Sequence, residues 1–412
     1  MAEMALLASA LVVFGYALFA RRLADGVITG PMIFLGLGLA MDQMGFVKLG
    51  QAEEALHVLA EITLVVVLFS DAAMLDLRAL RRRLAWPERM LIGGLPLAML
   101  FGFVVGVILL PDWPYWEVAL LAAILAPTDA ALGQAVVTNE QVPEPVREAL
   151  TVESGVNDGL ALPAVLMFAC LAVGGVHDNV QSNWLVFAFE QIGVGAVVGA
   201  TVGALGALAM AWAMGRRLST EAFEGIGVLA LAGMSYLIAI ELGGNGFLAA
   251  FIGGLAFGTV MQGRCKFVFE FMETEGQLLV LGTFLLLGAS IAPHALMHVE
   301  VVWIVLILLS LFVVRPAAIW VSLIGSSAPP VARGFMGWFG PRGLATALFA
   351  LLVLAQFDRL THGGEILSIA VLAVLISAVL HGLTAAPAAR WFARNLNPSS
   401  LPRAGETEKE TQ

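Results

Sequence analysis

Five charged side chains lie inside stretches of the sequence that are otherwise almost entirely apolar: Asp129, Glu153, Asp158, Arg315 and Arg342. An ionised group at bilayer depth is costly even on lenient insertion scales, so such residues usually face a protein interior or a water-filled path. Carboxylates and guanidinium groups in these positions are typical of ion transport and proton handling. The sequence therefore indicates chemistry based on the movement of small cations or protons.

One segment, 151–159, carries several oxygen-bearing side chains at helical spacing. Residues four apart share a face of a helix, so Ser154 and Asp158 lie next to each other on one face. Glu153 and Asn157 lie next to each other on the adjacent face. A hydroxyl and a carboxylate on one stripe are oxygen ligands that a hard cation accepts in place of water, so sodium, lithium or a proton could compete there. The alternative is that this segment is only the hydrated end of a helix, closing in a turn.

Two apolar stretches contain a proline at mid-depth beside a charged residue. One has Pro127 close to Asp129, and the other has Pro341 next to Arg342. Because proline removes a backbone donor and clashes with the preceding turn, each helix is expected to break or kink there. The freed backbone groups and half-helix ends need compensating charge, which Asp129 and Arg342 would supply in both signs. Two ordinary proline kinks are the alternative.

The composition places the chain in a membrane. Hydrophobic residues make up 60% of the 412 residues, charged residues make up 13%, and the mean hydropathy is +0.92, which excludes a soluble domain. Apolar runs of roughly 20 residues, each able to cross about 30 Å of hydrocarbon, repeat along the chain. We predict an all-α polytopic membrane protein with about thirteen transmembrane spans, at 4–20, 27–44, 56–76, 90–110, 117–138, 150–173, 184–214, 223–241, 245–262, 270–291, 300–323, 332–355 and 364–387.

The charged residues outside the spans predict the topology. Most of the 21 Lys and Arg residues fall on one face if the N-terminus lies outside, so the positive-inside rule predicts an external N-terminus and a cytoplasmic C-terminus. The transmembrane domain covers residues 1–394, and the polar segment 395–412 is predicted to be a short disordered cytoplasmic tail. The formal charge of −10 implies no nucleic-acid partner. Cys170 and Cys265 suggest neither a disulfide framework nor a metal site, and no cofactor is predicted.

The two proline-interrupted spans, the fifth and the twelfth, are seven apart and therefore run in opposite directions. An inverted repeat requires this arrangement. Interrupted helices in corresponding positions of two inverted halves indicate the midplane site of a secondary transporter.

These motifs together resemble the monovalent cation:proton antiporter family 1, the prokaryotic-type sodium/proton exchangers. The resemblance is carried by Pro127-Thr128-Asp129, followed by Glu153-Ser154 and Asn157-Asp158; further similar positions are Leu68 to Asp71, Gly244 to Ala249, Arg315-Pro316 and Arg342-Gly343. It implies a homodimer in the cell membrane. It also implies that a core bundle, spans 4–6 and 11–13, carries the ion past a dimerisation bundle, with one proton exchanged per cation.

The resemblance also implies roles for individual residues. Asp158 would alternately hold a proton and the cation. Ser154 and Thr128 would be further oxygen ligands of that cation, and Asp129 would act nearby through water. Asn157 would be a structural donor that ties the sixth span to the interrupted fifth.

Three more residues take implied roles around this site. Glu153 and Arg315 resemble the buried ion pair that joins the sixth and eleventh spans of the family. Asp71 corresponds to a position where some members place an acidic ligand, but the shorter Asp leaves direct contact with the ion open. An interfacial acid near the cytoplasmic end of its span is the alternative for Asp71.

The expected activity is exchange of sodium or lithium for protons, because a carboxylate shielded from water holds either a proton or a cation and binding one expels the other. Asn157, where electrogenic relatives place a second Asp, predicts electroneutral one-for-one exchange. A potassium/proton exchanger with the same fold is the main alternative. A channel would need a continuous pore with filter rings, whereas the two interrupted spans favour alternating access. An intramembrane aspartyl protease lacks its sequence motifs around Asp129 and Asp158, so no enzyme activity is predicted.

Overall fold

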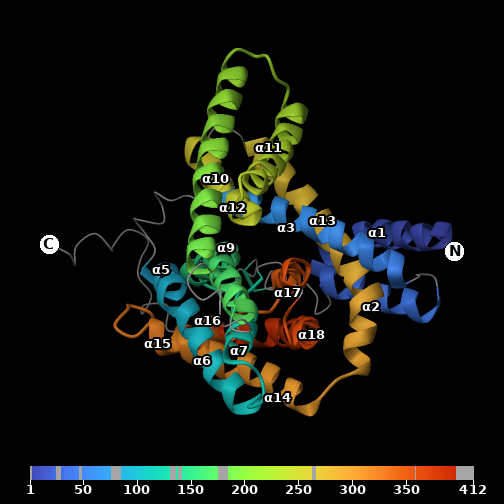
Figure 1. Ribbon diagram of the computed structural model, residues 1–412, viewed down its shortest axis with the longest axis vertical. Coiled ribbons are helices and arrows are strands. Elements are labelled where there is room, and N and C mark those ends of the chain that lie inside the picture. The colour runs from blue at the N-terminus through green and yellow to red at the C-terminus, as the bar shows by residue number, and fades with distance from the viewer. Residues whose placement is uncertain are drawn as a thin grey trace.

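In the computed structural model, the described residues are 2–24, 29–45, 49–75, 85–129, 136–137, 142–174, 184–261, 266–357 and 359–395. The regular elements within them are all helices, as Figure 1 shows. The all-α class predicted from the sequence is therefore confirmed for these residues. The predictions for Cys265 and for most of the C-terminal tail, 396–412, concern residues outside this set.

The helices vary from one turn to more than 30 residues in length. In chain order they are α1 (Ala2–Ala24), α2 (Gly30–Gln43), α3 (Leu49–Met74), α5 (Ala85–Arg89), η1 (Met90–Gly94), α6 (Leu95–Leu109), α7 (Tyr115–Ile124), α9 (Glu144–Gly174), α10 (Trp184–Gly215), α11 (Glu221–Glu241), α12 (Gly246–Met261), α13 (Lys266–Met297), α14 (Val301–Leu309), η2 (Ser310–Val314), α15 (Arg315–Ser322), α16 (Pro330–Trp338), α17 (Leu344–Gln356) and α18 (Gly363–Asn395).

Within the described residues, 8 helical runs are long and apolar enough to cross a membrane, and shorter apolar helices such as α7, α12 and α17 accompany them. The count of about thirteen spans stays a prediction. Two helices extend beyond their predicted spans, because α13 continues past Pro293 to Met297 and α18 continues past Pro387 to Asn395. Both extensions carry polar or basic residues, which is why an apolar window ends before the helix does.

Two segments of the chain near the predicted proline breaks are not helical. Helix α7 ends at Ile124, and the described residues that follow it, 125–129, have no helical structure; the same is true of residues 339–343 between α16 and α17. These segments meet, since the backbone N–H of Asp129 donates to the carbonyl oxygen of Pro341 at 2.9 Å. Most of the predicted fifth span beyond Asp129 lies outside the described residues, and the inverted repeat stays a prediction.

Two short π-helical segments, η1 and η2, occur in the fourth and eleventh predicted spans. The first is followed directly by Leu95-Pro96 and the second by Arg315-Pro316. Proline supplies no N–H to the preceding turn, and a π-helical turn is a common local adjustment to such a disturbance. These two spans are also seven apart in the predicted order. An inverted repeat would therefore place the two π-helical segments in corresponding positions of its two halves.

One group of helices, α2, α3 and α10–α13, packs at backbone contact distance through glycines. A Cβ atom built on Gly203 of α10 would lie 2.1 Å from the carbonyl oxygen of Gly253 in α12, and one built on Gly258 of α12 would lie 2.1 Å from that of Ala73 in α3. Gly38 brings α2 equally close to α13. Small residues of this kind permit close helix packing in membranes, so this group forms a tightly interlocked scaffold.

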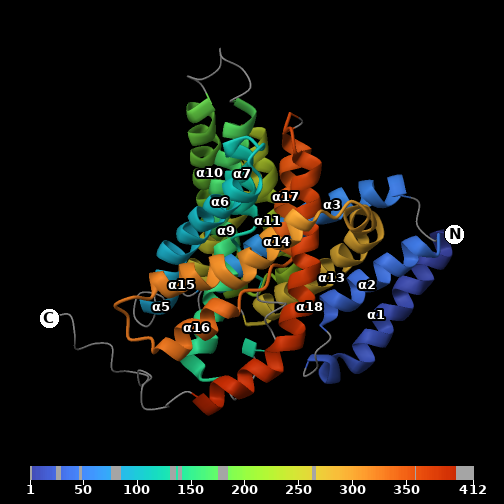
Figure 2. The ribbon, with the colours of Figure 1, turned by 90° about the horizontal axis from the view of Figure 1, so that it is seen from below.

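The second group consists of α5–α7, α9 and α14–α18. In Figure 1, α5–α7 and α14–α18 gather in the lower half of the molecule, whereas α10–α12 lie at the top and α1–α3 and α13 to the right. Figure 2 shows the same separation from below, with α1, α2 and α13 on one side and α5, α15 and α16 on the other. The two groups are in contact at several places, among them α13 with α18, α10 and α12 with α9, and α3 with α9 and α17. The place where α3 packs against α9 and α17 is called the meeting place below.

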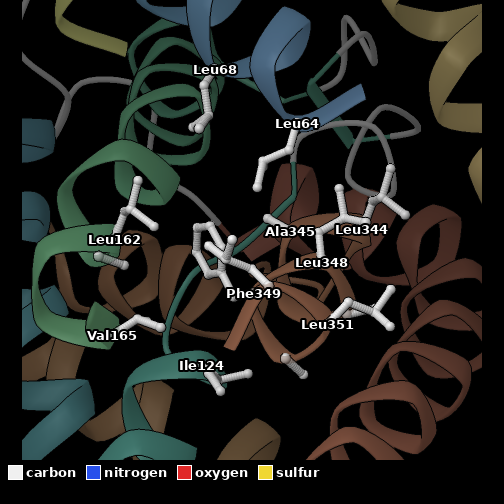
Figure 3. Close-up of a cluster of buried hydrophobic side chains, with 14 of the residues drawn as sticks. Leu64, Leu68, Ile124, Leu162, Val165, Leu344, Ala345, Leu348, Phe349 and Leu351 are labelled. Atoms are coloured by element: carbon white, nitrogen blue, oxygen red, sulfur yellow. The ribbon is translucent and has the colours of Figure 1, made fainter. Parts of the chain in front are cut away.

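An apolar cluster fills this meeting place (Figure 3). Helix α3 contributes Leu64 and Leu68, helix α9 contributes Leu162 and Val165, and helix α17 contributes Phe349, all of them buried. These side chains are all apolar, so they contact one another only through van der Waals interactions. The cluster is referred to below as the apolar layer.

A polar contact fixes the start of α7 to the loop before α18. Glu117 in the first turn of α7 is buried and accepts hydrogen bonds from the backbone N–H groups of Thr361 and His362, at 2.7 and 3.0 Å. The Nδ1 atom of His362 also lies 2.9 Å from Oε2 of Glu117. Trp113 stacks on the His362 ring, with the ring centroids 4.3 Å apart.

Candidate functional site

The ion pair expected between Glu153 and Arg315 is present and joins α9 to the start of α15. Both side chains are 2% exposed. Nη1 and Nη2 of Arg315 donate to Oε1 and Oε2 of Glu153, each at 3.0 Å, so the pair is bidentate. Nη2 also lies 3.4 Å from the carbonyl oxygen of Phe339, just beyond the end of α16. The pair therefore connects three segments that are distant in sequence.

A chain of hydrogen bonds attaches the non-helical segment after α7 to α9. Nδ2 of Asn157 donates to the hydroxyl oxygen of Thr128 at 2.6 Å, and that hydroxyl donates to Oε2 of Glu153 at 3.2 Å. The hydroxyl oxygen of Ser154 lies 3.3 Å from that of Thr128. Asn157 thus makes the tie that the resemblance implied. Because α9 runs unbroken through this buried segment, the alternative of a hydrated helix end closing in a turn is wrong.

Asp158 lies on α9 one turn beyond Ser154. The residue is partly exposed, yet its Oδ1 atom is buried and makes no hydrogen bond with any of the described residues. Asp129, Asp71 and Glu153 are all close enough to act on it electrostatically. A buried oxygen normally has a hydrogen-bond partner. An oxygen atom without a donor among the described residues, near three other acidic side chains, is suited to binding a proton or a cation.

The two charged residues at the interruptions cap each other's helices. Nη1 of Arg342 donates to the carbonyl oxygens of Ala126 and Pro127, at 2.6 and 2.9 Å, just beyond the C-terminal end of α7. Oδ2 of Asp129 accepts from the backbone N–H of Leu344, the first residue of α17, at 3.0 Å. Arg342 thus places a positive charge just beyond the C-terminal end of α7, and Asp129 places a negative charge at the N-terminal end of α17, and these are the signs that the helix dipoles favour. The contacts cross from one interruption to the other.

A glycine makes one of these crossed contacts possible. A Cβ atom on Gly343 would lie 1.8 Å from Oδ2 of Asp129, so any larger residue would push the carboxylate away from the start of α17. Gly340 has the same relation to the guanidinium group of Arg315, at 1.6 Å from Nε. The two glycines therefore let charged side chains reach the non-helical backbone.

Helix α18 supports the interruption between α16 and α17. The backbone N–H of Arg342 donates to Oγ of Ser377 at 2.7 Å, and Oγ of Ser377 lies 3.1 Å from Nδ1 of His381. Nε2 of His381 lies 3.1 Å from the carbonyl oxygen of Trp338, the last residue of α16. Nδ1 of His381 also lies 2.9 Å from the carbonyl oxygen of Ser377, so both ring nitrogens face a backbone carbonyl group.

The structure brings most of the expected site residues together. Thr128, Glu153, Ser154 and Asn157 are in direct contact, and Asp158 adjoins them on α9. Asp71 lies near the end of α3, which packs against α9, and its direct contact with an ion stays open.

Sequence reasoning missed several residues that support or adjoin the site. Ser377 was not identified, and Ser310 was missed although its Oγ lies 3.4 Å from Nη2 of Arg342. Thr346 was missed too; its buried hydroxyl has no hydrogen-bond partner among the described residues. The available signal was a polar residue inside an apolar run, and the four-residue spacing of Ser377 and His381 was the clearest instance.

Comparison with known proteins identifies a family and several relatives of this chain. The profile of the family described as "Sodium/hydrogen exchanger, transmembrane" matches residues 8–391. The K(+)/H(+) antiporter NhaP2 of Shewanella sp. (strain MR-4) is 26% identical over 297 residues, which cover 71% of this chain and 50% of that protein. The K(+)/H(+) antiporter NhaP of Alkalimonas amylolytica is 26% identical over 383 residues, covering 90% and 64%. The chain thus spans about half to two thirds of the length of these relatives.

A solved structure shares the fold. The sodium proton antiporter MjNhaP1 from Methanocaldococcus jannaschii at pH 8 superposes with a TM-score of 0.77 at 22% sequence identity, over 94% of this chain and 97% of that one.

Proposed function

This chain belongs to the sodium/hydrogen exchanger family, a family of transporters, and on that premise we propose that it exchanges sodium or lithium ions for protons across a cell membrane. The observation that carries the proposal is the buried Oδ1 atom of Asp158, which has no hydrogen-bond partner among the described residues. Asp158 lies one helical turn beyond Ser154, whose hydroxyl oxygen is 3.3 Å from that of Thr128. A bare carboxylate in that position would be occupied by either a proton or a cation. Binding of one would expel the other.

The neighbouring groups support this role of Asp158. Asn157, Thr128 and Glu153 form a closed hydrogen-bonded set with Arg315, so this region keeps its shape while Asp158 changes its occupant. The charge of Glu153 is matched by that of Arg315. Asp158 is then the group whose charge alternates, and Asn157 in place of a second acid supports electroneutral one-for-one exchange.

Alternating access supplies the transport step. If only an occupied and therefore neutral site can cross the apolar layer between the two helix groups, exchange is obligatory and leak is suppressed. The glycine-packed scaffold would stay fixed while the group containing α7, α9 and α17 moves. We propose that the scaffold provides the homodimer interface, and that the N-terminus is external and the C-terminus cytoplasmic.

Potassium is the second candidate for the cation. The curated relatives described above are named as K(+)/H(+) antiporters, although this chain covers only part of their length. The site offers oxygen ligands that all three monovalent cations accept, so the choice depends on ligand spacing.

The test is transport by the full chain in everted membrane vesicles that report proton movement by fluorescence, with lithium, sodium and potassium added in turn. The wild-type chain is expected to move protons in response to sodium or lithium. Asp158→Asn is expected to abolish the response to every cation while the protein still accumulates in the membrane, because the switchable charge is gone. Glu190→Gln, an exposed acid on α10, serves as the matched control and should keep wild-type exchange. Sodium-dependent proton movement by Asp158→Asn would refute the role of Asp158.

A further inference from the structure

One face of α3 carries two acidic residues, one before and one after the leucines of the apolar layer. Glu61, Leu64, Leu68 and Asp71 follow one another at intervals of three and four residues, and residues so spaced lie along one side of a helix. Leu64 and Leu68 are buried in the apolar layer against α9 and α17, as Figure 3 shows. Glu61 therefore lies on the side where α3 begins, and Asp71 lies on the other. The two residues are ten positions apart, which corresponds to about 15 Å of helix.

Glu61 is exposed although it lies inside the apolar span Ala55–Met74. A carboxylate directed into lipid at this position would be costly, so its exposed side is expected to face water. The helix side that it shares with Leu68 leads to the meeting place of the two helix groups.

A second residue holds the carboxylate in place. Tyr236 of α11 is 8% exposed, and its hydroxyl group donates to Oε1 of Glu61 at 2.5 Å. Phe247 of α12 packs on the Tyr236 ring with a centroid separation of 4.9 Å, which fixes the orientation of the phenol. This bond leaves Oε2 and the remaining lone pairs of the carboxylate available to another ligand. The two side chains therefore present a fixed pair of oxygen ligands.

We propose that Glu61 and the hydroxyl group of Tyr236 form a second cation-binding station, where a monovalent cation is held as it reaches or leaves Asp158. The inference rests on the proposed exchange function. Movement of α9 and α17 along α3 past Leu64 and Leu68 would transfer the cation from the neighbourhood of Asp71 to that of Glu61. Under the proposed topology, this station serves the external side of the membrane.

The test compares the two faces of the membrane for the full chain. Right-side-out and everted vesicles that contain a trapped pH indicator are titrated with sodium or lithium, and the half-saturating concentration is measured at each face. In Glu61→Gln, the value at the external face is expected to rise about ten-fold, the lower end of the effect that a charged cleft has on local counter-ion concentration. The value at the cytoplasmic face is expected to stay within about two-fold of the wild-type value.

Two further variants control the comparison. Tyr236→Phe removes only the hydroxyl group and should shift the same face in the same direction by a smaller factor. Glu241→Gln removes an exposed acid at the end of α11, five residues from Tyr236 on the same helix, and should shift neither face. If Glu61→Gln fails to accumulate in the membrane, Tyr236→Phe alone decides the proposal, because it retains the carboxylate.

The outcomes separate this inference from the proposed function. A wild-type chain that moves no protons in response to any of the cations refutes the proposed function. A wild-type chain that exchanges normally, together with a Glu61→Gln variant whose half-saturating concentration is unchanged, or is raised equally at both faces, refutes the second station alone.

Discussion

At the scale of single residues, the site separates groups that keep their charge from a group that can change it. Glu153 and Arg315 satisfy each other through two hydrogen bonds, and Thr128 and Asn157 extend that set. Asp158 lies beside them with one buried carboxylate oxygen that forms no hydrogen bond with any described residue. The same short stretch of α9 therefore contains a structural acid and a candidate transport acid, and the two are distinguished by their partners.

The ion pair leads to a prediction about folding. Glu153→Gln leaves the buried guanidinium of Arg315 without its counter-charge, and breaking such a pair costs about 3–5 kcal/mol. We expect less folded protein and a lower melting temperature, measured on detergent-purified protein by size-exclusion chromatography and thermal unfolding.

A double variant provides the control for this prediction. Glu153→Gln combined with Arg315→Met removes both charges, and replacing both partners of a buried pair is often close to neutral. The double variant should therefore recover part of the lost stability. A single variant that melts at the wild-type temperature would contradict a structural role for the pair.

At the scale of elements, neighbouring helices meet in two different ways. Within the scaffold, glycines bring backbones into contact, as Gly203 of α10 does with Gly253 of α12. Between the two groups, side chains rather than backbones make the contact. At Gly159 of α9, for example, the ring of Phe251 from α12 fills the space that a larger residue would need, since its Cε2 atom lies 2.2 Å from a Cβ atom built on the glycine.

This contact gives a prediction with a matched control on the same helix. Gly159→Ala would collide with Phe251, and overpacking of this kind costs about 1–3 kcal/mol. Gly155 lies one turn earlier and has open space around a built Cβ atom, so Gly155→Ala should be neutral or stabilise the helix by up to about 1 kcal/mol.

Both variants are compared by thermal unfolding and by exchange rate in vesicles. Equal effects of the two substitutions on stability would show that Phe251 does not pack closely against α9.

Some elements could be predicted from the sequence and others could not. Pro127 and Pro341 beside Asp129 and Arg342 indicated where helical structure ends, because proline chemistry is local. That Arg342 binds the carbonyl groups just beyond α7 while Asp129 binds the start of α17 could not be predicted, because it depends on how two segments more than 200 residues apart are packed. The contacts of Ser377 were missed for the same reason.

At the scale of the whole molecule, a rigid scaffold lies beside a group of helices that holds the charged network. The polar ties of that network run within the second group, from α9 to α15, from α7 to α17, and from α17 to α18. The apolar layer separates that group from α3 of the scaffold. Such a division suits a carrier in which one group moves relative to the other while the site keeps its geometry.

Competition for one carboxylate predicts how transport depends on pH. If a proton and a cation exclude each other at Asp158, each unit decrease in pH should raise the half-saturating cation concentration about ten-fold wherever the site is mostly protonated, by mass action. The maximal rate at saturating cation should change much less. The measurement is a cation titration of vesicles at a series of pH values, and a half-saturating concentration that does not vary with pH would contradict a shared site.

The contact between Glu117 and the loop before α18 limits the ways in which the molecule can rearrange. It fastens the first turn of α7 to the loop joining α17 and α18, while Asp129 and Arg342 fasten the chain just beyond the other end of α7 to α17. A helix attached at one end can pivot about that end, whereas a helix attached at both ends can move only together with the segments to which it is bonded. Helices α7, α17 and α18 are therefore expected to travel as a single piece that slides along α3 and α13, the scaffold helices against which α17 and α18 pack.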